Sequence, residues 1–272
     1  MKNLAVRITS ALIAFLTFLI VLYFFGDRGL YWIIFILVLR GSYEVARMSF
    51  NDSYPSFVRK LLVFLSAAIY LIITQEILRS LTGLLLILSF VIVVTLAIVL
   101  HKKFQRLEQV LTFIAKTCFG LIYTCFLPAT VIWLFDTNNG LEWLFCMICV
   151  VFSGDIGAYA FGNLFGKNKL APSLSPNKSV EGAIGGLALS VFAACCFIFV
   201  FPNTPIYILI LAGLLGGFLG QVGDLFESLI KRISGVKDAG AIMPGHGGVL
   251  DRVDGVLLAA PLFYLFSIYY SL

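Results

Sequence analysis

The chain has 272 residues, of which 61% are hydrophobic and 12% are charged, with a mean hydropathy of +1.03 and a net charge of +5. A soluble domain could not bury this much apolar surface, so the composition excludes a soluble globular protein. We expect an all-α, polytopic integral membrane protein, because a helix satisfies its own backbone hydrogen bonds inside a bilayer.

The apolar runs of the chain predict its membrane spans. A helix that crosses the apolar core of a bilayer, about 30 Å thick, needs about 20 apolar residues. About nine spans are expected on this basis, near residues 5–25, 29–48, 60–76, 81–100, 110–135, 141–163, 180–201, 205–229 and 253–271. The first run follows two basic residues and could be a signal peptide, but it is long and no small-residue cleavage site follows it, which favours an uncleaved span.

Lys and Arg residues alternate with the predicted spans. One side of the membrane holds Lys2, Arg7, Arg47, Arg59, Lys60, Lys102, Lys103, Arg106, Lys167, Lys169, Lys178, Lys231, Arg232, Lys237 and Arg252. The other side holds only Arg28 and Arg79. Because cytoplasmic loops carry the excess of Lys and Arg, the N-terminus is expected in the cytoplasm and the C-terminus outside.

Glycine is concentrated in the second half of the chain, where 18 of the 24 glycines follow residue 150. The eighth span alone contains Gly213, Gly216, Gly217, Gly220 and Gly223. Small residues allow helix backbones to approach closely within a membrane. We therefore expect residues 1–135 to form a scaffold and residues 136–272 to form a tightly packed catalytic unit.

A polar stretch, residues 224–254, interrupts this apolar sequence. Asp224, Glu227, Ser228 and Lys231 lie on one face of the helix that ends the eighth span. A helix end that emerges into water would explain Lys231, but it explains the more deeply placed Asp224 poorly. Ionisable groups inside a membrane are costly and commonly functional.

The segment that follows this helix, residues 235–250, is rich in glycine. Glycine permits backbone conformations in which N–H groups can surround a phosphate, although an ordinary turn between helices is the simpler alternative. His246 could contact phosphate or transfer a proton. Asp251 and Asp254 could cap the last helix, or Asp251 could join Asp224 in holding Mg²⁺ beside a polyphosphate.

A second polar region covers residues 153–182. Asp155 lies near the middle of a predicted span, where it should face a polar cavity or a cation. The lysines that follow, Lys167, Lys169 and Lys178, stand among serines and prolines. A cytoplasmic loop would explain these lysines equally well, but the serines and prolines beside them favour anion binding.

The run Ser228-Leu-Ile-Lys231-Arg232, followed by Lys237-Asp238 and by PGHGGVLDRVD at 244–254, resembles the signature of phosphatidate cytidylyltransferases. The upstream stretches GDIGAYAFGNLFGKNKL and SPNKSVEG are similar to further blocks of that family. The resemblance covers the C-terminal half in detail. Asn163, Asn168 and Ser179-Val180 depart from residues frequent in the family, which affects the details of substrate fit.

The resemblance implies that CTP and phosphatidate react to give CDP-diacylglycerol and pyrophosphate at a Mg²⁺ site, which a monovalent cation such as K⁺ could share. It implies catalytic roles for Asp224, Asp251, Lys237 and His246, with Asp224 and Asp251 as the metal ligands. Substrate contacts are expected from Asp155, Lys169, Ser175, Lys178, Glu181, Ser228, Lys231, Asp238, Gly247, Gly248, Arg252 and Asp254. The lipid phosphate would attack the α-phosphorus of CTP in line while Lys178, Lys237 and Arg252 neutralise charge.

The expected partners are CTP, phosphatidate and the lipid bilayer, without nucleic acid, and a homodimer is compatible with this reading. A bacterial inner membrane is expected, with the active site facing the cytoplasm. The alternatives are an ion or solute transporter, with Asp155, Asp224 and Glu227 along its path, and a CTP-dependent lipid kinase. Polar residues are few in the outer halves of the last four spans, which argues against a continuous transport path.

Overall fold

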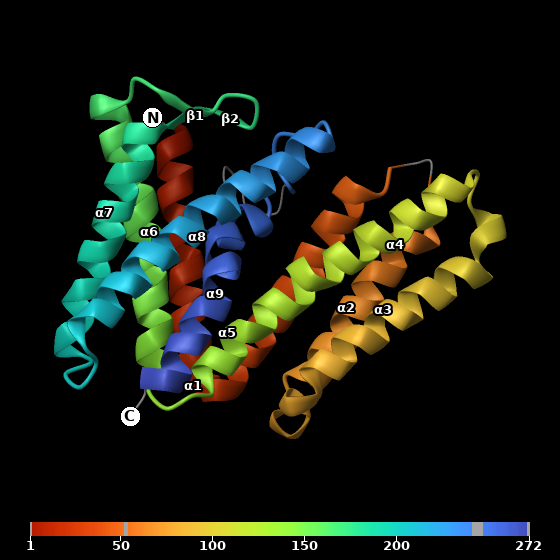
Figure 1. The fold of residues 1–272 in the computed structure, drawn as a ribbon, viewed down its shortest axis with the longest axis horizontal. Helices are drawn as coiled ribbons and strands as arrows, with labels where there is room; N and C mark the ends of the chain where they lie inside the picture. Colours follow the sequence, from red (N-terminus) through yellow and green to blue (C-terminus); the bar gives the residue numbers. More distant parts are fainter. Residues whose placement is uncertain (1, 52–53, 241–246, 271–272) are drawn as a thin grey trace. The chain divides into compact units, whose positions relative to one another are not determined.

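A computed structural model describes residues 2–51, 54–240 and 247–270 (Figure 1). Apart from one small hairpin, the regular secondary structure of the described residues is helical, which confirms the all-α prediction. The α-helices are α1 Lys2–Ser49, α2 Phe57–Ile73, α3 Thr82–Val99, α4 Leu107–Leu121, α5 Leu127–Phe135, α6 Gly140–Phe165, α7 Val180–Cys196, α8 Ile206–Ile233 and α9 Leu250–Tyr270. The hairpin consists of β1, Lys169–Ala171, and β2, Ser175–Ser179.

Each predicted span corresponds to helix. The first two spans fall in α1, which bends at Gly26, where φ is 53° and ψ is −136°, a conformation that glycine adopts without strain. The single span predicted near 110–135 corresponds to α4 and α5, joined by the π-helical turn Ile122–Phe126. Such turns insert an extra residue into a helix without ending it.

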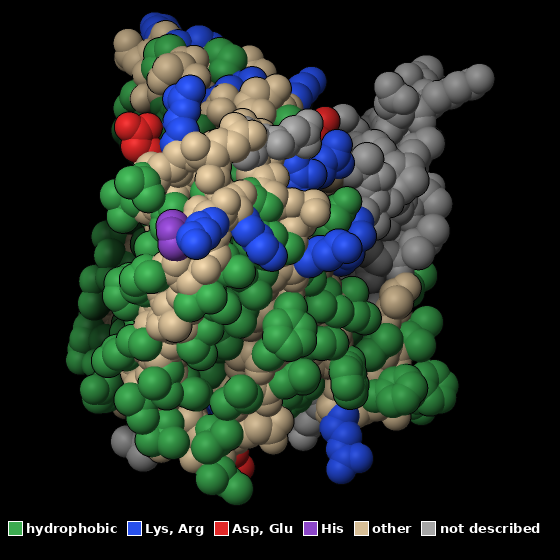
Figure 2. Space-filling model, turned by 90° about the vertical axis from the view of Figure 1, so that its right-hand side faces the viewer, with side chains coloured by type: hydrophobic (Ala, Val, Ile, Leu, Met, Phe, Trp, Pro, Cys, Tyr) green, Lys and Arg blue, Asp and Glu red, His purple; other side chains and the backbone are tan. Residues whose placement is uncertain are grey.

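Within the described residues, seven helical segments are long and apolar enough to cross a membrane. They are Arg28–Ser49, Glu76–Val99, Leu107–Phe135, Gly140–Phe165, Val180–Phe199, Ile206–Ile233 and Leu250–Tyr270. The protein is thus a multi-pass membrane protein. Helix α2, with 17 residues, is shorter than these segments, so the number of nine spans and the cytoplasmic N-terminus stay predictions. Figure 2 shows one face on which a broad hydrophobic surface lies beside a band of Lys and Arg side chains.

The chain divides into two compact units. The first unit comprises Met1–Ile132 and Val236–Leu250, and the second comprises Trp133–Gly235 and Asp251–Leu272. The division therefore assigns the segment Val236–Leu250, which follows α8 in the chain, to the same unit as the N-terminal helices. The scaffold and catalytic roles predicted for the two halves stay predictions.

The first unit is held together by helices α1 to α4. Val38 and Val45 of α1, Leu62 of α2 and Phe113 of α4 are fully buried. Beyond the end of α1, the Phe50 ring packs against the Phe113 ring at a centroid distance of 6.1 Å. Because lipid tails are as apolar as these side chains, their burial stabilises the unit by van der Waals packing between helices rather than by removal from water.

The second unit is built on close contacts between α6, α7 and α8. The Ser190 hydroxyl of α7 donates to the Val150 carbonyl of α6 at 2.9 Å. A Cβ atom on Gly217 of α8 would lie 2.5 Å from that same hydroxyl oxygen, so only glycine fits there. The five glycines of α8 named above are all buried, which confirms that they serve close helix packing.

Candidate active site

A cavity of about 330 Å³ lies in the second unit. It is lined by residues from α6, the hairpin, the start of α7 and the middle of α8: Asp155, Ala158, Tyr159, Leu170, Ser175, Asn177, Lys178, Ser179, Gly182, Ala183, Gln221 and Asp224. Its walls therefore combine apolar groups with carboxylates, amides, hydroxyls and one lysine. The two polar regions of the sequence meet here, because Asp155, Ser175 and Lys178 come from the first and Asp224 from the second.

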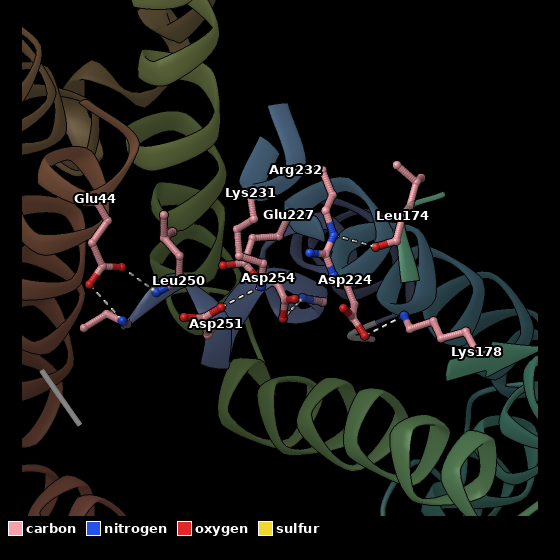
Figure 3. A network of polar contacts seen from close by, with 12 residues as sticks. Glu44, Leu174, Lys178, Asp224, Glu227, Lys231, Arg232, Leu250, Asp251 and Asp254 are labelled. Atoms are coloured by element: carbon pink, nitrogen blue, oxygen red, sulfur yellow. Dashed lines mark hydrogen bonds and ion pairs between the residues drawn. The ribbon is translucent and has the colours of Figure 1, made fainter. Parts of the chain in front are cut away.

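An ion pair joins the hairpin to α8 at this cavity. The Lys178 ammonium lies 2.5 Å from Oδ2 of Asp224, and both side chains are partly exposed, at 27% and 39% (Figure 3). Asp155 on α6 interacts electrostatically with both of them. The structure therefore brings together three predicted site residues, Asp155, Lys178 and Asp224.

A second ion-pair group connects α8 with α9. The Lys231 ammonium binds Oε2 of Glu227 at 3.0 Å and Oδ1 of Asp251 at 2.6 Å. Glu227 is only 1% exposed, and its Oε1 has no hydrogen-bond partner. Lys231, predicted to contact substrate, is thus occupied with two carboxylates, and Glu227 is buried rather than solvated.

Asp254 connects these two groups electrostatically. Its carboxylate interacts with Asp224 and with Glu227, while Oδ1 accepts the Gly255 N–H at 2.8 Å. We call the five carboxylates the acidic cluster: Asp155, Asp224, Glu227, Asp251 and Asp254. They face two lysines, Lys178 and Lys231, so the cluster carries an excess of acidic groups.

Such an excess suits a divalent cation better than it suits an anion alone. Among the described residues, no group of three or more His, Cys, Asp or Glu side chains is arranged to hold a metal ion by itself. Mg²⁺ commonly takes one or two protein carboxylates and completes its octahedron with water and phosphate oxygens. The hard oxygen donors of Asp224 and Asp251 fit that requirement. Asp251 is 10% exposed and already engaged with Lys231, so Asp224 is the more accessible of the two.

Side chains of the neighbouring helices hold the hairpin in place within the second unit. The Glu181 carboxylate, near the start of α7, accepts the backbone N–H of Lys167 at 3.1 Å and of Asn168 at 3.2 Å. It also accepts the Asn168 amide at 2.8 Å. Both Glu181 oxygens thus hold the backbone that enters the hairpin, and the substrate contact expected of Glu181 stays a prediction.

Two further bonds fix the other end of the hairpin. The Ser179 hydroxyl accepts the Gly182 N–H at 3.1 Å and so caps the N-terminus of α7. Near the turn, Arg232 of α8 donates from Nε to the Leu174 carbonyl at 3.2 Å. Arg232 therefore does more than mark one side of the membrane, because it binds the turn that precedes Ser175.

The glycine-rich segment Val236–Leu250, the glycine loop, lies in the first unit. Its described residues contact Glu44 of α1, whose Oε1 accepts the Val249 N–H and whose Oε2 accepts the Leu250 N–H, both at 3.0 Å. Glu44 is 1% exposed. This buried carboxylate was not predicted from the sequence.

The remaining predicted residues lie on α8, α9, the hairpin and the glycine loop. Ser228 is on α8, Arg252 on α9, Lys169 on β1, and Lys237, Asp238, Gly247 and Gly248 in the glycine loop. Gly247 has φ of 84°, the positive backbone angle expected for a loop glycine. His246 lies outside the described residues. The catalytic and binding roles of all these residues stay predictions.

The sequence matches the model of the cytidylyltransferase family over residues 5–270. The chain belongs to the cytidylyltransferase family. A relative from Staphylococcus epidermidis, named phosphatidate cytidylyltransferase, is 33% identical over 97% of this chain and 98% of its own length.

Relatives of the same name from Staphylococcus saprophyticus and Staphylococcus haemolyticus are 41% and 45% identical over 55% and 48% of this chain. These alignments cover 58% and 51% of the two relatives, so there the match spans about half of their length. The family membership confirms the resemblance inferred from the polar motifs of the C-terminal half.

Four polar side chains that line the cavity of this cytidylyltransferase-family protein were not predicted as site residues: Tyr159, Asn177, Ser179 and Gln221. Gln221 of α8 donates from Nε2 to the Ala183 carbonyl at 2.9 Å, which fixes its amide against α7. Asn177 is exposed on β2. A signal was available for Gln221: it lies three residues before Asp224 and so on the same face of an otherwise apolar helix.

Proposed function

We propose that the protein transfers the cytidylyl group of CTP to phosphatidate, giving CDP-diacylglycerol and pyrophosphate. The observation that carries this proposal is the 330 Å³ cavity in which Asp155 and Asp224 face Lys178. Family membership and the full-length similarity to a protein named phosphatidate cytidylyltransferase support the same reaction.

In the proposed mechanism the protein mainly orients the two substrates and neutralises the charge of their phosphates. Phosphoryl transfer involves little covalent chemistry from the protein, so catalysis rests on positioning and electrostatics. The phosphate of phosphatidate attacks the α-phosphorus of CTP in line, the bond to the β-phosphate breaks, and pyrophosphate leaves. Since a phosphate monoester has a second pKa of about 6, the attacking phosphate is largely ionised near neutral pH and needs no strong base.

The residues of the cavity suit this task. The Lys178 ammonium can bind a phosphate oxygen while it remains close to Asp224. Lys237 of the glycine loop and Arg252 of α9 are the other cations proposed to neutralise charge. Ser175, Asn177 and Gln221 offer neutral donors and acceptors around the substrate.

Asp224 and Asp251 are the residues proposed to hold Mg²⁺, and a monovalent cation such as K⁺ could share the acidic cluster. A bound Mg²⁺ would supply positive charge to the phosphates of CTP. Lys231 fixes the Asp251 carboxylate through its 2.6 Å contact. In this account the buried Glu227 keeps Lys231 in place, because the same ammonium binds both carboxylates.

We also propose that the protein resides in a bacterial plasma membrane with this site facing the cytoplasm. CTP is water-soluble and would arrive from the cytoplasm, whereas phosphatidate would enter from the adjacent leaflet. The excess of Lys and Arg in the loops next to the site supports this orientation.

The test is an assay of the purified protein with CTP, phosphatidate and Mg²⁺. We expect CDP-diacylglycerol and pyrophosphate from the wild type, and turnover lower by about 10²–10³-fold for Asp224→Asn and for Asp251→Asn, as when one charge-stabilising group is lost. Asp136→Asn, an exposed acid in the loop between α5 and α6, is the control and should behave as the wild type. Release of CDP instead of pyrophosphate would indicate a lipid kinase, and near wild-type turnover of either site variant would refute its metal-binding role.

A further inference from the structure

Glu44 is a buried acid at a fixed end of a helix. It lies in α1 one and a half turns before the last helical residue, Ser49, and is 1% exposed. Two cations hold the backbone at this helix end: Lys116 donates to the Ser49 carbonyl at 2.6 Å, and Arg59 donates from Nε to the Phe50 carbonyl at 2.7 Å. Basic groups at the C-terminal carbonyls stabilise a helix end, so the backbone of α1 near Glu44 is held in place.

Both oxygens of Glu44 are engaged with the glycine loop. Oε1 accepts the Val249 N–H and Oε2 accepts the Leu250 N–H, so one carboxylate binds two successive backbone amides at 3.0 Å each (Figure 3). Leu250 is the first residue of α9, whose early N–H groups have no partner within the helix. A carboxylate here satisfies these donors and also complements the positive end of the helix dipole.

The other end of the described loop meets the same carboxylate. A Cβ atom on Gly240 would lie 2.5 Å from Oε1 of Glu44, and one on Gly248 would lie 2.7 Å from Oε2. The Gly248 position would also lie 2.7 Å from the Gly240 nitrogen, so the two glycine backbones adjoin one another. Glu44 therefore adjoins both Gly240 and Gly248, and a side chain at either position would collide with its carboxylate.

This contact links residues that are 205 and 206 positions apart in the sequence. Lys237 and Asp238 lie three and two residues before Gly240, and Asp251 directly follows Leu250 in the chain. Because backbone placement passes to the next residue through planar peptide bonds, a shift at Leu250 moves the start of α9 and its Asp251 with it.

We propose that Glu44 is a positioning residue for cytidylyl transfer, which fixes both ends of the glycine loop and the first residue of α9. The inference rests on the proposed function, because the loop and Asp251 are assigned to that reaction. Glu44 does not touch the substrate in this account, since both of its oxygens bind backbone N–H groups. It acts by placing Lys237 and Asp251 for the reaction.

Glu44→Gln is the sharpest variant, because it keeps the shape of the side chain and one acceptor oxygen. Its NH₂ group must face one of the two backbone N–H groups, so one hydrogen bond is lost. We expect kcat to fall by about 10–100-fold, since misplacement of a reacting group by about 1 Å can cost about 10²-fold. The KM values for CTP and phosphatidate should change by less than about threefold, because a lost positioning contact lowers kcat without removing substrate binding.

Two further variants distinguish a positioning role of Glu44 from a general effect on the stability of the protein. Glu108→Gln, at an exposed glutamate of α4 in the same unit, should leave kcat unchanged. Gly240→Ala should lower kcat in the wild type. It should lower kcat less in a Glu44→Ala background, where the carboxylate oxygen 2.5 Å from the new Cβ is gone and only the Gly248 Cα at 3.2 Å stays close. Multiplicative losses in the double variant would overturn the proposed contact.

Limited proteolysis tests the glycine loop directly, without measuring enzyme activity. Trypsin should cut after the exposed Lys237 faster in Glu44→Ala than in the wild type, while cleavage elsewhere stays unchanged, because local opening exposes backbone to a protease. An unchanged cleavage rate would overturn the proposal even if the wild type proved inactive with CTP and phosphatidate, which would refute only the proposed function. The proposal would also be overturned if the kcat of Glu44→Gln stayed within about twofold of the wild type. The same holds if its loss of kcat were matched by an equal loss of folded protein in a melting curve.

Discussion

Gly223 of α8 is the position at which a single added methyl group should most directly disturb the acidic cluster. It is buried against α9, and its neighbour in the chain is Asp224. A Cβ atom at Gly223 would lie 2.9 Å from the Gly255 Cα and closer still to the Asp254 carbonyl oxygen. Gly223→Ala should therefore push α8 and α9 apart where they carry Asp224 and Asp254.

The size of the effect follows from these distances. Ordinary contacts of a Cβ atom begin at 3.4 Å, so a separation of 2.9 Å requires the helices to move apart by at least 0.5 Å. Overpacking of this kind typically costs about 1–3 kcal/mol of folding free energy. A displacement approaching 1 Å can lower turnover by about 10²-fold, so we expect a loss of about 10–100-fold.

The assay is steady-state formation of CDP-diacylglycerol, accompanied by a melting curve in the same detergent. Gly220→Ala, one turn earlier on α8, is the matched control, because its Cβ would lie 3.4 Å from the nearest Val151 carbon, an ordinary contact. We expect the control to retain wild-type turnover, and alanine should favour the helix by up to about 1 kcal/mol. Equal turnover and equal melting temperatures for the two variants would refute the reasoning.

Two further variants test the hairpin and its ion pair. Lys178→Met removes the ammonium that binds Asp224 and should lower kcat/KM for CTP by about 10–150-fold, the equivalent of about 1.5–3 kcal/mol for a charge-assisted bond. Lys102→Met, at an exposed lysine of the first unit, is the control, and equal kinetics of the two variants would contradict the assignment. Ser179→Ala removes the cap of α7 and should lower the free energy of unfolding by about 0.5–2 kcal/mol, measured by denaturant titration. Ser173→Ala, at an exposed serine, is the control and should leave the free energy of unfolding unchanged. An unchanged stability of Ser179→Ala would show that the cap contributes nothing measurable.

The helices of this protein were predictable because long apolar runs can hardly adopt another structure in a membrane. The hairpin Lys169–Ser179 was not predicted, because its two short strands contain a proline, two serines and two lysines rather than β-branched residues. Its stability comes instead from Glu181 and Arg232, which bind its backbone. Such side-chain anchors leave no periodic pattern in the sequence.

The chemistry of the cavity was predictable in part. Asp155 and Asp224 stand out as charges within apolar runs, and the structure places both at one cavity with Lys178. Glu44 does not stand out, because it lies near a helix end among other polar residues and its partners follow more than 200 residues later. A hydrogen bond from backbone N–H groups depends on the fold and not on the identity of the donor residues, so no motif could reveal it.

The anchoring of the hairpin at two places has a consequence for the thermodynamics of ligand binding. Glu181 holds the backbone before β1, and Arg232 holds the Leu174 carbonyl in the turn. The conformational entropy of this segment is therefore lost when the chain folds and not when a nucleotide arrives. Binding at the cavity should then proceed with a small change in heat capacity, unlike the large change that accompanies folding of a loop around its ligand.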